Sequence, residues 1–129
     1  MERQSKNEKL LQYFKDICRI PRQTGDEEAI SQYLLDFAKA RGLQAERDAH
    51  HNVLIRKPST IPGYKGPTVI VQGHMDIVYE KSADSTHKYE DGIHVVEEDG
   101  YLKSADGTSL GADNGLAVAY AMDLLDRND

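Results

Sequence analysis

The stretch Thr68-Val69-Ile70-Val71-Gln72-Gly73-His74 decides which fold the sequence predicts. Residues 68–71 form a continuous apolar run, which is typical of a strand covered on both faces in an α/β sheet. The run leads directly to His74, so this side chain would leave the carboxyl end of a buried strand, where open α/β sheets place their ligands. We therefore predict an α/β fold with a mixed, largely parallel sheet flanked by helices.

Two amphipathic helices are expected before this strand, each opened by a capping box. The capping boxes are Ser5 with Glu8 and Thr24 with Glu27. The first helix should cover about residues 6–19, and the second should end with Gly42 as its C-terminal cap. Residues 44–48 and 52–56 then predict two strands, and residues 58–66, with two prolines and two glycines, predict a loop.

The sequence after the central run predicts a loop, a hairpin and a helix. Residues 79–91 are polar and should form a surface loop. Residues 93–96 and 101–103 flank Asp99-Gly100, a dipeptide that favours a tight hairpin turn. Residues 116–125 are apolar nearly all round, so they predict a helix packed inside the domain.

Length and composition predict one soluble domain. The 129 residues have a mass of 14.5 kDa, with 39% apolar and 29% charged residues, which suits a globular protein with a core. The net charge of −6, without a basic run, argues against nucleic acid or a membrane surface as the partner. No apolar run approaches the roughly 18 residues of a membrane span, so we expect a cytoplasmic protein. The single cysteine, Cys18, should be a buried structural thiol.

His74, Asp76 and Asp113 are the candidate site residues. His74 and Asp76 are two apart, so in extended backbone they share a face and the carboxylate can orient the imidazole ring. Asp113 lies in the Gly-flanked stretch Leu110-Gly111-Ala112-Asp113-Asn114-Gly115, where a side chain can approach an ion. Taken singly, the pair could be a chance pattern, and Asp113 or Asn114 could be the N-cap of the following helix. Together the three residues favour half of a metal site.

Other patterns are less promising as metal sites. A calcium loop starting at Asp106 fails because Leu110 and Ala117 occupy positions that need oxygen ligands. The remaining histidines are expected to be solvated, and they are His50, His51, His87 and His94.

Three motifs resemble the N-terminal part of the aminoacyl-histidine dipeptidases, also called Xaa-His dipeptidases or peptidase D, of the dinuclear zinc amidohydrolase superfamily that includes carnosinases. The motifs are Ile20-Pro21-Arg22-Gln23-Thr24-Gly25-Asp26-Glu27, Gly73-His74-Met75-Asp76-Ile77-Val78-Tyr79-Glu80-Lys81 and Thr108-Ser109-Leu110-Gly111-Ala112-Asp113-Asn114-Gly115. The resemblance runs from about residue 10 to the end. Asn114 favours this branch over related tripeptidases, which tend to carry an acidic residue there. Tyr79 and His51 depart from the family, which often has Cys and Gly at these positions.

The resemblance implies a role for each candidate. His74 would be a terminal ligand of one zinc, Asp113 would bridge two zincs, and the Asp113–Asn114 peptide bond would be cis. Asp76 would orient His74 and is the catalytic candidate of this half-site. Two Zn²⁺ ions per active site, or Co²⁺ or Mn²⁺ in their place, would activate a water that hydrolyses a small, carnosine-like Xaa-His peptide.

The general base, the remaining ligands and the lid or dimerisation domain follow the bridging aspartate in this family. The resemblance therefore implies that residues 1–129 are the N-terminal portion of a catalytic domain and are inactive alone. We expect such a piece to bind zinc weakly or not at all, to expose apolar surface at residues 69–71 and 116–125, and to self-associate, for example as a homodimer. Two alternatives stay open, namely a related tripeptidase or N-acyl amino acid deacylase, and a non-catalytic binding module.

Overall fold

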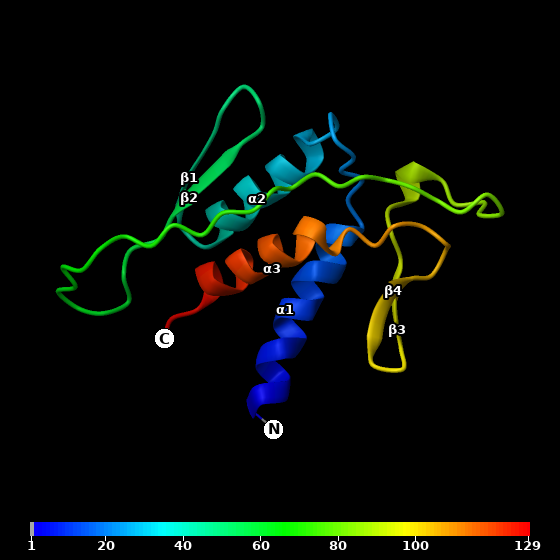
Figure 1. The fold of residues 1–129 in the computed structure, drawn as a ribbon. Helices are drawn as coiled ribbons and strands as arrows, with labels where there is room; N and C mark the ends of the chain where they lie inside the picture. The colour runs from blue at the N-terminus through cyan, green and yellow to red at the C-terminus, as the bar shows by residue number, and fades with distance from the viewer. Residues whose placement is uncertain (1) are drawn as a thin grey trace.

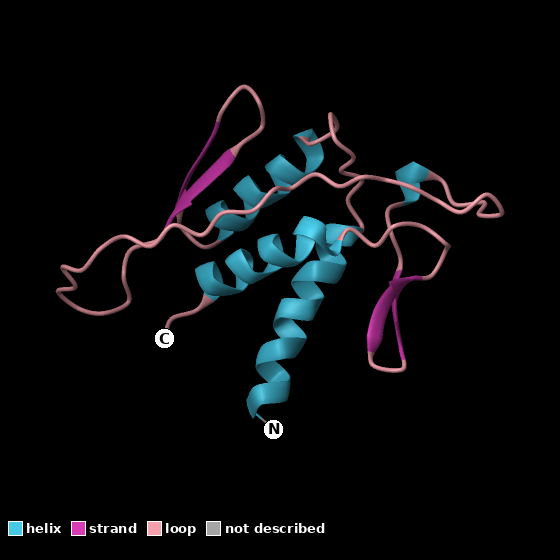
Figure 2. Cartoon of the chain, viewed as in Figure 1, coloured by secondary structure: helices cyan, strands magenta, loops and turns pink. Residues whose placement is uncertain are grey.

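The computed structural model describes residues 2–129, which form three α-helices and two β-hairpins (Figure 1). The elements are α1 (Glu2–Cys18), α2 (Glu28–Ala40), β1 (Gln44–Arg47), β2 (Val53–Arg56), a short 3₁₀ helix (Tyr89–Asp91), β3 (Val95–Glu98), β4 (Tyr101–Ser104) and α3 (Ala112–Asp126). Helices α1 and α3 pack across each other, and the β1–β2 hairpin lies beside α2. A long extended segment links β2 to the second hairpin (Figure 2).

The predicted parallel sheet is wrong. Within residues 2–129 the strands pair only as two separate antiparallel sheets, β1 with β2 and β3 with β4. Residues 68–71 are extended but are not a strand. Their apolar side chains are exposed: Val69 80%, Ile70 84% and Val71 53%. A buried parallel strand needs hydrogen-bonded neighbours and helices over both faces, and the described residues do not supply them to this run.

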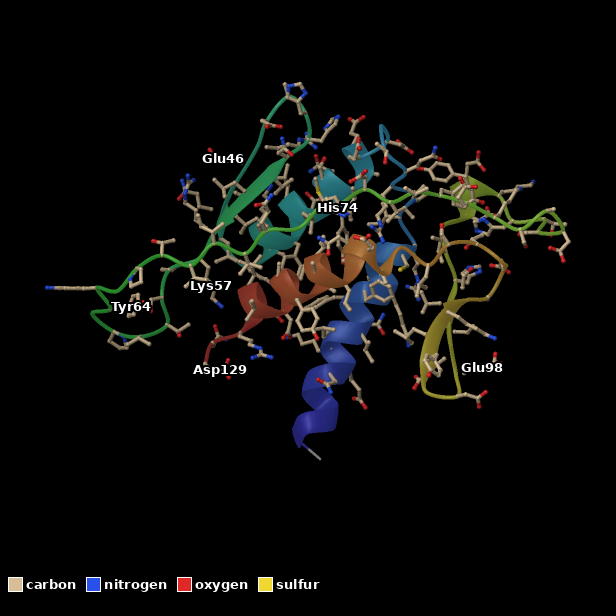
Figure 3. All side chains as sticks on the ribbon, viewed as in Figure 1. Glu46, Lys57, Tyr64, His74, Glu98 and Asp129 are labelled. Atoms are coloured by element: carbon tan, nitrogen blue, oxygen red, sulfur yellow. The ribbon has the colours of Figure 1, made fainter. Side chains whose placement is uncertain are left out.

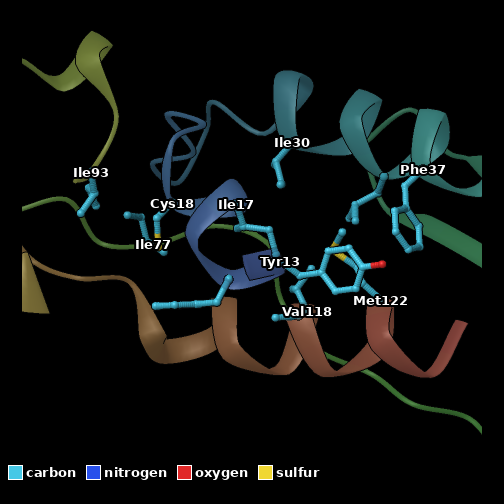
Figure 4. Close-up of a cluster of buried hydrophobic side chains, with 12 residues drawn as sticks. Tyr13, Ile17, Cys18, Ile30, Phe37, Ile77, Ile93, Val118 and Met122 are labelled. Atoms are coloured by element: carbon cyan, nitrogen blue, oxygen red, sulfur yellow. The ribbon is translucent and has the colours of Figure 1, made fainter. Parts of the chain in front are cut away.

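The core lies where the three helices meet (Figure 4). Its buried side chains recur at helical spacing, and they include Phe14, Ile17, Ile30, Leu34, Phe37, Val118, Ala119 and Met122. Cys18 is 1% exposed, and its Sγ donates to the Leu110 carbonyl over 3.6 Å. Burial raises the pKa of this thiol, so the prediction of a buried structural cysteine is confirmed.

The helix starts differ from the predicted ones. Helix α1 begins at Glu2, before the predicted start, and the side chain of Ser5 lies outside what the structure describes. Helix α2 has Glu27 as its N-cap with no side-chain cap, because Thr24 and Glu27 bond elsewhere, to Asp76 and to the backbone of Gly25. The second capping box is therefore wrong. The C-cap of α2 is Arg41, and Gly42, the predicted cap, is the next residue, where it has φ +67° and donates to the Lys39 carbonyl.

Helix α3 is buried on one side only. Tyr120 and Leu124 are 53% and 47% exposed, so the prediction of a fully internal helix is wrong. The predicted cap is wrong too, because the N-cap is Gly111, and Asp113 and Asn114 have non-helical backbone angles inside the first turn.

The β3–β4 hairpin agrees with the local sequence signal, and β1 and β2 fall within the strands predicted at residues 44–48 and 52–56. In the β3–β4 turn Asp99 and Gly100 have φ +52° and +79°, the backbone that an Asp-Gly hairpin turn requires. Residues 58–66 form a loop as predicted, and residues 79–91 form one apart from the 3₁₀ turn. None of the helices described is long and apolar enough to span a membrane.

Candidate metal centre

His74 lies where the extended segment passes the start of α3 (Figure 3), and the structure brings Asp76 and Asp113 to it. His74 Nε2 lies 3.1 Å from Asp113 Oδ1. On the other side of the ring, Nδ1 lies 3.0 Å from the carbonyl oxygen of Asp76 and 3.2 Å from its Oδ1. One imidazole therefore stands between two carboxylates from separate parts of the chain.

The surroundings of Asp76 orient the His74 ring. Thr24 Oγ1 donates to Asp76 Oδ2 over 2.6 Å, which leaves Oδ1 facing the ring. Since the Asp76 carboxylate and carbonyl oxygens accept only, ring Nδ1 carries the donated proton and Nε2 is the atom available to a metal ion. The hydrogen bond from Thr24 is the main cause that lowers the pKa of Asp76, and the charge of His74 lowers it further.

Charge also affects the imidazole itself. Burial lowers the pKa of His74, but hydrogen bonds to Asp76 and Asp113 and the charges of both carboxylates outweigh it, so this pKa is raised. The side chains of His74 and Asp113 are 53% and 96% exposed, so the site is open to solvent and to ions.

The donor geometry fits a zinc ion. With ligand distances of about 2.0–2.1 Å, two donors of a tetrahedral zinc site lie about 3.3 Å apart. The 3.1 Å between His74 Nε2 and Asp113 Oδ1 is close to that separation. Imidazole and carboxylate donors also suit Co²⁺ and Mn²⁺. Among the described residues, however, no cluster of three or more His, Cys, Asp or Glu side chains could hold a metal ion. The residues present fit part of a coordination sphere.

The turn before α3 presents Asp113 to His74. The Asp113–Asn114 peptide bond is cis, as the resemblance implied. Gly111 has φ +83°, and a Cβ there would lie 2.9 Å from the Arg22 guanidinium and 3.0 Å from Ile77. Position 111 therefore requires glycine for both backbone conformation and space.

Sequence reasoning missed two residues of the Ile20–Glu27 motif that support this site. Thr24 was expected to cap α2, but it bonds Asp76 instead. Arg22, for which the sequence predicts no role, is 1% exposed and donates to backbone carbonyls in both segments that carry the candidate ligands. Its only signal in the sequence is an arginine beside Pro21, just past the first predicted helix.

The remaining histidines lie outside this site. His50 and His94 are exposed as predicted, whereas His87 is 8% exposed, so its predicted solvation is wrong. Its Nδ1 accepts from the Tyr79 hydroxyl over 2.7 Å, and its Nε2 donates to the Gly92 carbonyl over 2.5 Å. Both ring nitrogens are thus satisfied in the neutral form, which makes burial tolerable.

The chain is homologous to dipeptidases over most of its length. It is 38% identical over 116 residues to the cytosol non-specific dipeptidase of Escherichia coli (strain K12), an alignment that covers 90% of this chain. It also matches the crystal structure of the aminoacylhistidine dipeptidase from Vibrio alginolyticus, with a TM-score of 0.87 and 35% identity over 93% of this chain. No family model matches the sequence. The chain spans 24% of the length of each of these two proteins.

Proposed function

We propose that this chain is one part of the catalytic domain of a zinc-dependent dipeptidase that acts on small peptides, Xaa-His peptides of the carnosine type among them. One observation carries the proposal. His74 Nε2 and Asp113 Oδ1 lie 3.1 Å apart in a chain that is 38% identical to a dipeptidase.

Each site residue has a defined part in this proposal. His74 and Asp113 would hold zinc, and Asp113, which is 96% exposed, would offer its carboxylate to two ions. Bound zinc supplies a Lewis acid for the scissile carbonyl and lowers the pKa of water toward about 7. Asp76 holds the proton on ring Nδ1, so the lone pair of Nε2 is aimed at the metal position.

We propose that the remaining ligands and the general base come from sequence outside these 129 residues. The chain spans 24% of its relatives' length, and the residues described hold no three-ligand cluster. The exposed run at residues 69–71 supports the same idea, because further strands would cover it. Alone, the chain would be inactive and prone to self-association, for example as a homodimer. A cytoplasmic location, with a peptide rather than nucleic acid or membrane as partner, is part of the proposal.

The reading frame downstream of Asp129 and the activity of its product test the function. We expect an acidic pair after an apolar strand, and a longer product that hydrolyses dipeptides only with divalent metal bound. In this product His74→Ala should lose nearly all turnover, because an open zinc site with three protein ligands cannot lose one and keep its geometry. His50→Ala, in the exposed turn between β1 and β2, is the matched control and should retain turnover.

Several results would contradict the proposal. A stop codon directly after Asp129 would favour the binding module, and residual activity of His74→Ala within about tenfold of the unmodified protein would exclude a ligand role. Turnover of N-acetylated amino acids or tripeptides, but not of β-Ala-His and other dipeptides, would assign the chain to the deacylases or tripeptidases. One relative is named a non-specific dipeptidase and the other an aminoacylhistidine dipeptidase, so the assay also includes a panel of unrelated dipeptides.

A further inference from the structure

A buried arginine joins the two segments that carry the candidate ligands. Arg22 Nη1 donates to the Met75 carbonyl over 2.8 Å, and Nη2 donates to the Gly111 carbonyl over 3.1 Å. Met75 directly follows His74, and Gly111 lies two residues before Asp113. A single guanidinium group therefore contacts the backbone beside each ligand.

The backbone around Arg22 is itself attached to the His74 segment. Ile77 N donates to the Arg22 carbonyl over 3.0 Å, and Thr24 N donates to the Ile77 carbonyl over 3.2 Å. These bonds form an isolated parallel bridge between Gln23 and Ile77. Residues 22–24 and 75–77 thus behave as one unit, and the Arg22 side chain extends from that unit to the turn before α3.

The start of α3 leaves space for this side chain. A Cβ at Gly111 would lie 2.9 Å from Arg22 Nη2, and a Cβ at Gly115 would lie 2.6 Å from the same atom. Since real Cβ atoms do not approach so closely, both positions must lack a side chain for the guanidinium to lie there.

Stability alone is a poor explanation for a cation in this place. Arg22 is 1% exposed, none of its hydrogen-bond acceptors is a carboxylate, and its Nε is buried without a partner. Burial lowers the pKa of this guanidinium, although the Cys18 and Asp76 groups partly offset the effect. Burying a charge without an ion pair is costly, so a geometric role accounts better for its presence.

We propose that Arg22 is a positioning residue that sets the distance between His74 and Asp113 by bonding the backbone of both segments. Two separate nitrogens reach two separate carbonyls, which a guanidinium fork can do and a lysine ammonium cannot copy. The importance of this distance for metal binding rests on the proposed function. The distance itself does not, and it can be measured without metal.

A disulfide between the two ligand positions tests this distance, because its effective concentration reports how readily the two side chains come within bonding reach. In a Cys18→Ala background, His74→Cys and Asp113→Cys together form the site pair, and equilibration with glutathione under chelator gives its effective concentration. The control pair is Ala45→Cys with Ile55→Cys, which face each other across β1 and β2. Each pair is measured with Arg22, with Arg22→Met, which removes the donors, and with Arg22→Lys, which keeps the charge.

We expect Arg22→Met and Arg22→Lys to lower the effective concentration of the site pair by about tenfold or more, because methionine removes both charge-assisted hydrogen bonds and a lysine ammonium cannot bond both carbonyls as the guanidinium fork does. The control pair should not change. An unchanged site pair in Arg22→Met would overturn the proposal, and so would an unchanged one in Arg22→Lys. An equal fall in both pairs would show that Arg22 supports the whole fold and would also overturn it. If zinc failed to bind the longer protein through His74, the proposed function would fail while this result stood.

Discussion

Replacing Ile70 by lysine tests whether residues 68–71 cause self-association. Ile70 is 84% exposed, so Ile70→Lys should change the free energy of unfolding of the monomer by no more than about 0.5 kcal/mol. In an interface the same side chain would contribute about 1.5–3 kcal/mol, and a symmetric dimer buries it twice. The lost 3–6 kcal/mol, roughly twice the single-site value, corresponds to an increase of about 100-fold to 20,000-fold in the dimer dissociation constant.

Sedimentation over a concentration series measures this constant. The matched control is Tyr101→Lys, because Tyr101 is 75% exposed but lies on β4, in the β3–β4 hairpin rather than in the extended segment that contains residues 68–71. Because Tyr101 lies outside residues 68–71, the effect of Ile70→Lys should exceed that of the control. Equal dissociation constants for the two variants, or a chain that stays monomeric at every concentration, would show that residues 68–71 do not cause self-association.

Three further substitutions test the fold and the site. Asp126→Asn should cost about 1–2 kcal/mol at neutral pH, because hydrogen bonds to a charged group are lost at a partly exposed position. A hydrogen bond from Lys9 is the main cause that lowers the pKa of Asp126. This stabilisation is therefore present above about pH 4 and is lost on further acidification. Urea unfolding at a series of pH values should show that the free energy of unfolding falls less steeply in acid for Asp126→Asn than for the unmodified chain. Asp76→Asn in the longer protein should weaken zinc binding about 10- to 100-fold in competition with a chelator, since the ring of His74 loses its orienting charge; an unchanged affinity would remove Asp76 from the site. Gly100→Val places a β-branched residue at φ +79° and should destabilise the β3–β4 hairpin by at least about 1–2 kcal/mol. Backbone amides should then exchange faster in this hairpin alone, and an equal increase in exchange across the whole chain would contradict a local effect.

Local chemistry was predictable from the sequence where neighbouring residues decide the structure. The Asp99-Gly100 turn follows from the backbone angles that these two residues tolerate. The periodic apolar residues of the helices follow from burial of one face against the other helices.

Features that depend on distant partners were not predictable. The apolar run at residues 68–71 has the composition of a central strand, but the pairing that makes a strand has to come from other segments. Thr24 fits a capping box equally well whether its hydroxyl bonds the helix or a carboxylate far along the chain, and the tertiary bond to Asp76 is the one that forms. Arg22 gave no periodic signal, because its partners are backbone carbonyls of remote residues.

Calorimetric titration of the 129-residue chain with zinc, run beside His74→Ala and Asp113→Ala, tests the central claim that the chain carries part of a metal centre. We expect zinc to bind the unmodified chain with a Kd above about 1 μM, because two ligands leave most of the coordination sphere to water, and each substitution should abolish this binding. Stoichiometric binding by the monomeric chain with a Kd below about 1 μM, lost in Asp113→Ala, would contradict the account by showing that the centre is complete within these residues.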